Sequence, residues 1–272
     1  WTQLIDPMTV PTGGVTYPTV VSKALESTEI AVLRQGPWQV FFQYGQLDYN
    51  HSQREALSYE AMYDTIPITL NPGTAPYGSP LYLDYYRAGI GDNTPLVDGS
   101  PQEGWRRGRL LDFSSGPTFI AAGQFPFANG YNAIRTFEIV DNRLIDELTL
   151  EPEDQAVTEP RTLGFMLHLE KPGKLEAVEG MTPVDDFSAN KPKGYQYWKK
   201  VERCDVTDEV RLTVEYGPKA FELVIRTDGP FRLYTAQAPG KPPEIRTVIM
   251  VEKDAIAADF TTEWIPIEDT AR

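Results

Sequence analysis

The sequence predicts an all-β protein built as a β-sandwich of stacked antiparallel sheets, with only a few short helical turns. Its apolar segments are short, rich in Val, Ile, Phe, Tyr and Trp, and recur at regular spacing along the chain. Turn signals such as Asp228-Gly229-Pro230 separate them, and neither an internal repeat nor a coiled-coil heptad is present. A chain of 272 residues with 41% hydrophobic content is large enough to bury the core of such a sandwich.

The first part of the chain is expected to lead into a single domain. Residues 1–21 are interpreted as a linker or an irregular segment, because Pro and Gly recur there without a sustained period. The sequence begins at Trp1 rather than Met, so a processed mature form and a piece of a longer product are both compatible with it. Residues 22–272 are expected to form the sandwich, and its first strands, 29–34 and 38–44, flank a Gly-Pro turn.

Residues 44–102 form a polar stretch that is dense in Asn, Asp and Gln and contains one of the two histidines. Turn signals at Asn71-Pro72-Gly73, Tyr77-Gly78 and Asp98-Gly99 divide it into runs that are too short for ordinary helices. Its polar side chains are therefore expected at strand ends and turns, where binding groups are usually located.

The rest of the chain is expected to continue as short strands joined by turns. Residues 151–159 are acidic and predict a solvated loop, and residues 178–194, with several Pro and Gly, predict a long loop. The expected strands are 110–122, 130–140, 143–150, 164–170, 195–201, 210–216, 221–227, 231–236 and 245–252.

The chain is acidic, with a formal net charge of −14 and an isoelectric point of about 4.6. This charge argues against nucleic acid and anionic membrane surfaces as partners, since both are themselves negative. No apolar run reaches the length that a bilayer-spanning helix needs. Cys204 is the only cysteine, so the chain forms no internal disulfide, and cysteine usage leaves the compartment open.

Six short motifs follow one another in the polar stretch, and their order and spacing are more specific than any one of them. They are Tyr44-Gly45, His51-Ser52-Gln53-Arg54-Glu55, Asn71-Pro72-Gly73-Thr74, Tyr86-Arg87, Asp92-Asn93-Thr94 and Val97-Asp98-Gly99-Ser100-Pro101-Gln102. This ordered set resembles the C-terminal β-sandwich of the heparinase II/III-like polysaccharide lyases, which include alginate lyases. Tyr131, Arg135, Thr136, Asp146 and His168 extend the resemblance, which covers residues 30–175.

The resemblance implies a metal site that this chain has altered. In metal-binding members, zinc is held at the positions that carry Gln53, Asn71 and Asp92 here. Two neutral amides and one carboxylate make a poor zinc site, because zinc favours imidazole, thiolate and carboxylate ligands. We therefore expect no zinc and no other cofactor. The three side chains are interpreted as a relic that satisfies itself by hydrogen bonding, and a reworked site for a harder cation is the alternative.

The resemblance also assigns His51 to the catalytic cleft, where its counterpart is implicated in charge neutralisation or proton transfer at the uronic acid. A turn histidine with structural hydrogen bonds is the alternative. Glu55, Tyr86 and Arg87 are interpreted as scaffold, the last two as an aromatic-cation pair on a sheet face. His168 lies between two leucines and is expected to face solvent or an inter-sheet hydrogen bond.

A basic cluster at residues 103–109 stands out in this acidic chain. Trp105, Arg106 and Arg107 are candidate substrate-binding residues, because an aromatic face stacks on sugar rings while guanidinium groups bind carboxylates. Such a cluster is needed if a uronic or sulfated polysaccharide is to approach a protein of this net charge. An exposed strand or loop with alternating charge is the alternative interpretation.

Three functions remain open from the sequence. The chain is either the sandwich portion of a polysaccharide lyase that cleaves a uronic-acid-containing glycan by β-elimination, or a non-catalytic carbohydrate-binding or structural module. In the first case an α/α toroid, in the same chain or in a partner chain, supplies the catalytic tyrosine, and an extracellular or periplasmic location is expected. An unrelated sandwich such as a sugar mutarotase-like protein is the third possibility, although the paired histidines of that chemistry are not evident.

Overall fold

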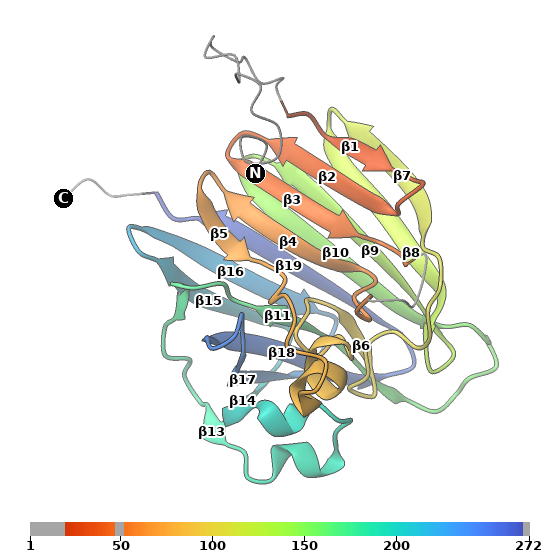
Figure 1. The fold of residues 1–272 in the computed structure, drawn as a ribbon, viewed down its shortest axis with the longest axis vertical. Helices are drawn as coiled ribbons and strands as arrows, with labels where there is room; N and C mark the ends of the chain where they lie inside the picture. Colours follow the sequence, from red (N-terminus) through yellow and green to blue (C-terminus); the bar gives the residue numbers. More distant parts are fainter. Residues whose placement is uncertain (1–19, 47–51, 269–272) are drawn as a thin grey trace, which may run out of the picture.

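The structure is a computed structural model that describes residues 20–46 and 52–268. These residues form three antiparallel sheets, which confirms the predicted all-β fold (Figure 1). Their helical structure is limited to η1 (Tyr82–Tyr86), η2 (Phe187–Asn190) and η3 (Tyr195–Tyr197). In this part of the chain no helix has the length and apolarity that a bilayer crossing needs. Most of the predicted N-terminal linker, together with His51, lies outside the described residues.

The first sheet, called the front sheet here, takes its strands in chain order from β1 to β5. Buried and half-exposed residues alternate along β3 and β4, as expected of a sheet with one covered face. The strands are β1 (Lys23–Leu25), β2 (Ile30–Gln35), β3 (Trp38–Gln43), β4 (Ser58–Tyr63) and β5 (Ile66–Thr69).

The second sheet, called the long sheet, has the order β12-β15-β16-β19-β10-β9-β8-β7. It joins a hairpin series from the middle of the chain to strands from the C-terminal part through the β10–β19 pair. Its strands are β7 (Arg109–Ser115), β8 (Thr118–Ala128), β9 (Tyr131–Val140), β10 (Arg143–Pro152), β12 (Lys174–Leu175), β15 (Glu209–Tyr216), β16 (Lys219–Thr227) and β19 (Ala258–Pro266).

The third sheet has the order β13-β14-β17-β18-β11-β6 and is called the capped sheet, because helical turns cover its outer face. Its strands are β6 (Pro95–Val97), β11 (Arg161–His168), β13 (Thr182–Pro183), β14 (Lys199–Val206), β17 (Phe231–Pro239) and β18 (Ile245–Ala255). The short β6 pairs with β11, so the end of the polar stretch is an edge strand of this sheet.

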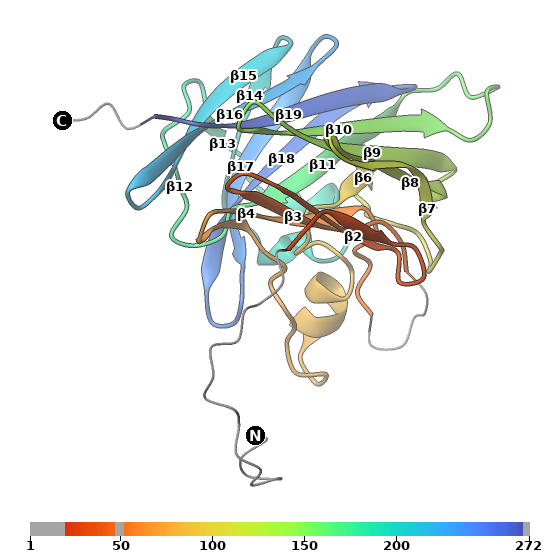
Figure 2. The ribbon, with the colours of Figure 1, turned by 90° about the horizontal axis from the view of Figure 1, so that it is seen from above.

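The front sheet and the capped sheet cover neighbouring parts of one face of the long sheet (Figure 2). Phe42 of β3 packs against Phe137 of β9 with ring centroids 4.9 Å apart, and Phe165 of β11 packs against Phe260 of β19 at 5.5 Å. The strand register places Phe137 and Phe260 on the same face. One apolar core is therefore shared by all three sheets.

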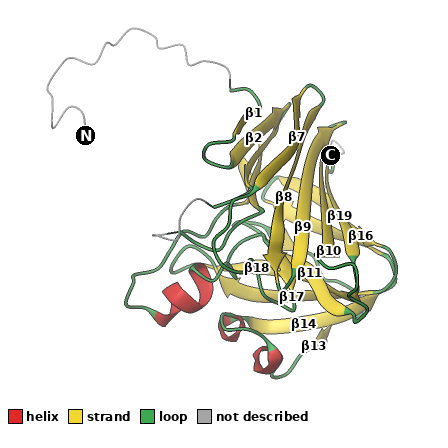
Figure 3. Ribbon diagram, turned by 90° about the vertical axis from the view of Figure 1, so that its right-hand side faces the viewer, coloured by secondary structure: helices red, strands yellow, loops and turns green. Residues whose placement is uncertain are grey.

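A second, smaller core lies on the outer face of the capped sheet. Met166, Tyr234 and Met250 of that sheet pack there with Tyr85 and Tyr86 of η1. The Tyr86 hydroxyl donates a hydrogen bond to the Gly240 carbonyl at 2.6 Å. Figure 3 shows the helical turns outside the sheets, next to β14 and β17. The strand β11 is consequently buried on both faces. The sequence predicted instead that alternate residues of this strand, such as His168, would point out of the core.

Several predicted elements differ from the observed ones. The predicted strand 110–122 is interrupted by the Gly116-Pro117 turn and becomes the hairpin of β7 and β8, because proline supplies no backbone N–H to a ladder. The predicted strand 195–201 begins as η3, and the loop 178–194 contains β13 and η2. The strand β19 and the turn η1 were not predicted, although β19 lies in the middle of the long sheet.

The Tyr44-Gly45 motif is explained by a close approach of two backbones. Gly45 follows β3 and lies against Gly108, and a Cβ at either position would overlap the other segment or the Glu29 carboxylate. The Gln46 N–H donates to the Arg106 carbonyl at 3.1 Å in the same place. The basic segment at residues 103–109 is thereby fixed beside the end of β3.

Candidate functional site

Asn71 joins two carboxylates from distant parts of the polar stretch. Its Nδ2 donates hydrogen bonds to Glu55 Oε2 at 2.7 Å and to Asp92 Oδ1 at 2.9 Å. Its Oδ1 accepts the Gly73 N–H at 2.7 Å, so donors and acceptor are all in use. Glu55 precedes β4, Asn71 follows β5 and Asp92 follows η1. We call Gln53, Glu55, Asn71 and Asp92 the Asn71 cluster.

Gln53 lies beside this group without bonding to Asn71 or Asp92. Its Nε2 donates to the Gly73 carbonyl at 2.6 Å, while its buried Oε1 has no hydrogen-bond partner among the described residues. The Gln53 carbonyl accepts a hydrogen bond from the side chain of Gln46. The three positions of the implied metal site therefore converge. Asn71 bonds directly to Asp92, whereas Gln53 and Asn71 are joined through Gly73, to which both bond.

Burial makes two carboxyl groups of the cluster resist ionisation. Burial raises the pKa of Glu55 from 4.5 to about 7, the charge of Glu60 adds to the rise, and hydrogen bonds from Gln43 and Asn71 oppose it. Burial, followed by the charge of Glu55, raises the pKa of Asp92 well above its usual range, and Arg246 opposes this. The two carboxyl groups therefore carry less negative charge near neutral pH than two exposed carboxylates would.

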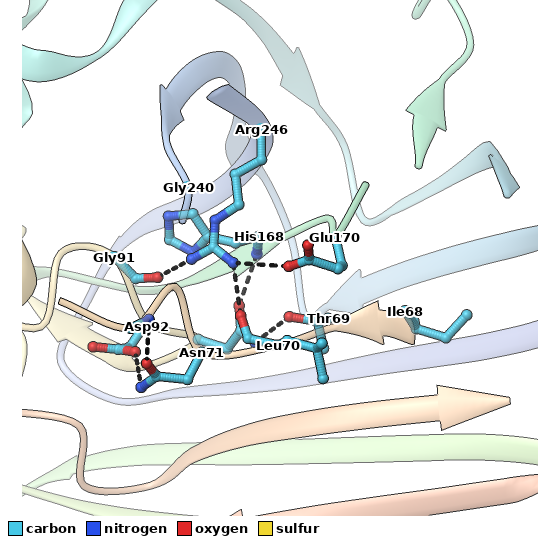
Figure 4. A network of polar contacts seen from close by, with 12 residues as sticks. Ile68, Thr69, Leu70, Asn71, Gly91, Asp92, His168, Glu170, Gly240 and Arg246 are labelled. Carbon is cyan, nitrogen blue, oxygen red and sulfur yellow. Dashed lines mark hydrogen bonds and ion pairs between the residues drawn. The ribbon is translucent and has the colours of Figure 1, made fainter. Parts of the chain in front are cut away.

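Arg246 of β18 brings together the two chain segments that carry Asn71 and Asp92 (Figure 4). Its side chain is 3% exposed; Nη1 donates to the Leu70 carbonyl at 2.7 Å, and Nη2 donates to the Gly91 carbonyl. Glu170, at 3.7 Å, is its ion-pair partner. Because Leu70 and Gly91 immediately precede Asn71 and Asp92, one buried arginine positions both residues of the cluster.

Asn93 connects this site to all three sheets. Its Nδ2 donates to the Tyr59 carbonyl at 2.8 Å, and its Oδ1 accepts the His168 N–H at 2.7 Å. The Asn93 carbonyl accepts a hydrogen bond from Arg135 of β9 at 2.5 Å. Arg135 in turn forms a bidentate pair with Asp146 of β10 at 2.7 and 2.8 Å, and both side chains are buried.

His168 is fully buried, so the solvent-facing one of its two expected placements is wrong. The loop after η1 covers its side of β11, and its backbone rather than its ring bonds to Asn93. Burial and then the charge of Arg246 lower the pKa of the imidazole well below its usual value. It is therefore neutral and has no direct access to a ligand. His51, the catalytic candidate, lies outside the described residues.

The predicted substrate-binding residues are partly engaged with the protein itself. The guanidinium of Arg87 lies 5.6 Å from the ring centroid of Trp105. Arg87 therefore pairs with Trp105, whereas the sequence predicted a pair with Tyr86. The side chain of Arg107 is 70% exposed but forms an ion pair with the buried Glu29. The side chain of Arg106 is exposed. Whether these residues bind substrate stays a prediction.

The Asn71 cluster does not fit zinc. The amide of Asn71 directs N–H groups, not lone pairs, toward both carboxylates, and its oxygen is already bonded to Gly73. Within residues 20–46 and 52–268, no three His, Cys, Asp or Glu side chains gather in an arrangement that could hold a metal ion. The expectation that the protein binds no zinc is a prediction, which metal analysis can test.

Sequence reasoning missed three features of the site. It interpreted Glu55 as scaffold, although this residue bonds directly to Asn71, and it gave no role to Arg246 or Glu170. The available signal was a charged residue inside the apolar segment at residues 245–251, where a buried arginine needs partners.

Comparisons with known proteins identify a family and a shared fold. A sequence model of the family described as "Heparinase II/III-like, C-terminal" matches residues 18–158. No curated protein sequence matches the chain significantly. Among solved structures, a heparinase III gene product has a TM-score of 0.62 and 12% identity, with 93% of this chain and 37% of that chain covered.

Heparan sulfate lyase HepC from Pedobacter heparinus gives a TM-score of 0.62 and 14% identity, with 94% of this chain and 38% of that chain covered. A putative aldose 1-epimerase from Escherichia coli K12 gives 0.53 and 10% identity, with 88% and 98% covered. At such identities these structures share the fold alone, and this chain spans less than two fifths of each lyase. Because the family model covers more than half of the chain, the protein belongs to the heparinase II/III-like family.

Proposed function

We propose that this chain is the sandwich portion of a polysaccharide lyase-related protein and that it binds a uronic-acid-containing glycan. The observation that carries the proposal is the convergence of the family's motif residues at the junction of the front and capped sheets. Asn71 and Asp92 are 21 residues apart in sequence, yet they bond directly, and Arg246 positions both. A polar site mounted on strand ends and loops is typical of ligand binding.

The proposal limits what the chain does chemically. Eliminative cleavage needs a base for the C5 proton, an acid for the leaving oxygen and a group that neutralises the carboxylate, all placed around one sugar ring. His51 and exposed arginines such as Arg106 are the groups that this chain offers toward that set. We infer that the remaining groups come from an α/α toroid, in the same protein or in a partner chain.

A non-catalytic glycan-binding module is the second candidate, and the hydrogen bonding of Asn71 favours it. In the cluster an amide occupies the space between two carboxylates, and all of its donors and acceptors are engaged. The mutarotase-like alternative has less support. Similarity to the epimerase extends to the fold alone, and the one histidine among the described residues is fully buried.

Calorimetric titration of the chain with glucuronan and alginate oligosaccharides tests the proposal, with neutral dextran oligosaccharides as the control. We expect saturable binding of the acidic glycans, weaker binding at high salt and none of the neutral one. The same affinity for dextran, or no binding of any acidic glycan, would overturn the proposal. Such a ligand also implies an extracellular or periplasmic location.

A further inference from the structure

A concave site lies next to the Asn71 cluster. It is a pocket of about 270 Å³ between the segment before β4, the residues after η1, the turn after β6 and the loop after η2. Ligand pockets usually measure roughly 300–1,000 Å³, so this one has room for about one sugar ring rather than an oligosaccharide. Arg54, the immediate neighbour of Gln53 and Glu55, lines it.

The pocket carries an excess of positive charge in a protein whose net charge is −14. Arg54 and Lys193 line it with exposed side chains, and neither forms an ion pair within the described part of the chain. Glu103 is the one acidic residue in the lining, and its Oε2 accepts the Asn129 N–H at 3.1 Å. The lining therefore holds two cations that form no ion pair within the described residues and one carboxylate that is already hydrogen-bonded.

The rest of the lining suits the face of a sugar ring. Pro192 contributes half-exposed aliphatic surface, against which the C–H groups of a pyranose pack, and the buried Ile90 and Pro101 complete this part of the lining. Gln102 also lines this wall, but its buried amide bonds to the protein itself and supports the wall. An apolar wall with a few convergent charged and polar groups is the usual composition of a small-ligand site.

The frame of the pocket is held rigidly, whereas the charged ends are free. The Arg54 N–H donates to the Arg87 carbonyl at 3.1 Å, and Gly89 lies so close to the Arg54 carbonyl that a side chain there would overlap it. Gln102 is 1% exposed; it accepts the Ala56 N–H at 2.9 Å and donates to the Gly104 carbonyl at 2.7 Å. A preformed frame lowers the ordering cost of binding.

We propose that this pocket binds one acidic sugar unit of the glycan, with Arg54 and Lys193 contacting its carboxylate or sulfate group. A guanidinium fork matches either anion, and the lysine adds a second charge from the opposite segment of the lining. The proposal deepens the proposed function, on which it rests. It predicts that anion recognition on this chain depends on the pocket and not only on the basic segment at Trp105 to Arg107.

The test compares glycan affinities of four proteins by calorimetric titration. They are the wild-type chain, the double variant Arg54→Ala/Lys193→Ala, the variant Ala88→Phe and the control Lys174→Ala/Lys219→Ala. Ala88 is half-exposed in the lining of the pocket, so a phenylalanine there would occupy part of its volume. The control removes the same charge from β12 and β16, far along the long sheet from β8. Glucuronan fragments supply carboxylate alone, heparin fragments supply carboxylate and sulfate, and dextran sulfate supplies sulfate alone.

We expect the double variant to bind at least tenfold more weakly than the control, because it removes two charged donors that would bond to the anion of the ligand. Ala88→Phe is expected to weaken binding while leaving the melting temperature near that of the wild type. If the wild-type chain binds glucuronan more tightly than dextran sulfate, the pocket recognises a carboxylate, and the reverse order indicates a sulfate. Affinities unchanged in both pocket variants would overturn the pocket assignment and leave the proposed function intact. A wild-type chain that binds no acidic glycan would overturn both.

Discussion

Asn71 decides what chemistry the central cluster supports. A neutral imidazole has one N–H and an ionised carboxylate has none, so neither could donate two hydrogen bonds to Glu55 and Asp92, whereas the amide does so at 2.7 and 2.9 Å. The amide thereby stabilises negative charge on carboxylates that burial otherwise disfavours. The residue suits a carboxyl pair better than a metal ion.

Glu55 makes stability depend on pH in a direction opposite to most paired carboxylates. Its folded pKa of about 7 exceeds its ordinary value of 4.5, so the folded state binds more protons between these values and stability falls as pH rises through them. The unfolding free energy of Glu55→Gln should therefore rise relative to that of the wild type as the pH increases. We expect the difference between the two proteins to grow by roughly 2–3 kcal/mol from pH 5 to pH 8. Urea unfolding at both pH values measures this, with the exposed Glu147→Gln as control. A pH-independent difference would contradict the account.

Metal content is the second test at this scale. Amide oxygens are weak zinc ligands, and the N–H groups of Asn71 point at both carboxylates. We expect chelator-free protein to contain no stoichiometric zinc by elemental analysis. Zinc at one equivalent that disappears in Asp92→Asn would show that the cluster rearranges around a metal.

At the scale of elements, the buried Arg135–Asp146 pair connects the long sheet to the site. Arg135 of β9 donates to the carbonyls of Leu57 and Asn93 as well as to Asp146. Its guanidinium also lies 4.6 Å from the centroid of the Tyr59 ring. The segment before β4 and the segment before β6 are thereby held on the same strand of the long sheet.

Removal of this arginine should be costly. Arg135→Ala leaves Asp146 buried without its partner and two carbonyls without a donor, and we expect a loss of about 3–5 kcal/mol in unfolding free energy. Arg143→Ala is the control, because its pair with Glu263 is 3.7 Å long and Arg143 is 49% exposed; there the loss should stay below about 1 kcal/mol. The apolar double variant Arg135→Met/Asp146→Leu should be more stable than Arg135→Ala. Equal losses in Arg135→Ala and Arg143→Ala would disprove this role.

At the scale of the whole molecule, the sequence predicts the strands better than their arrangement. Short apolar segments between turns identify β2, β3, β9 and β10 within a few residues, because these depend on local patterns. The helical turn η1 was missed, since its tyrosines read equally well as strand residues and become helical through packing on the capped sheet. The burial of β11 on both faces likewise follows from the layers above and below it.

The candidate site could be predicted only in part, for the same reason. The motif order led to Gln53, Asn71 and Asp92, but Arg246 is 176 residues from Leu70 in sequence and no local pattern connects them. The raised pKa of Glu55 depends on burial by other segments, which the sequence does not display. Pairing of Arg87 with Trp105, rather than with its neighbour Tyr86, is a long-range contact of the same kind.

The charge of the whole molecule bears on the glycan as well. A net charge of −14 repels a polyanion at distances up to the Debye length, about 8 Å at physiological salt, so capture depends on local positive groups. Arg54, Lys193 and Arg106 are exposed cations near the site or in the basic segment. Glycan affinity should therefore respond to these residues more than to overall charge.

The central proposal is that this chain, which has the family's sandwich, binds a glycan without completing the elimination chemistry by itself. Absorbance of the unsaturated uronate product, followed with glucuronan, alginate and heparan sulfate, measures this directly. We expect no turnover from the isolated chain, because loss of even one general acid-base group removes roughly two to four orders of magnitude in rate. Turnover that disappears in His51→Ala would contradict the account and show that the sandwich is catalytic on its own.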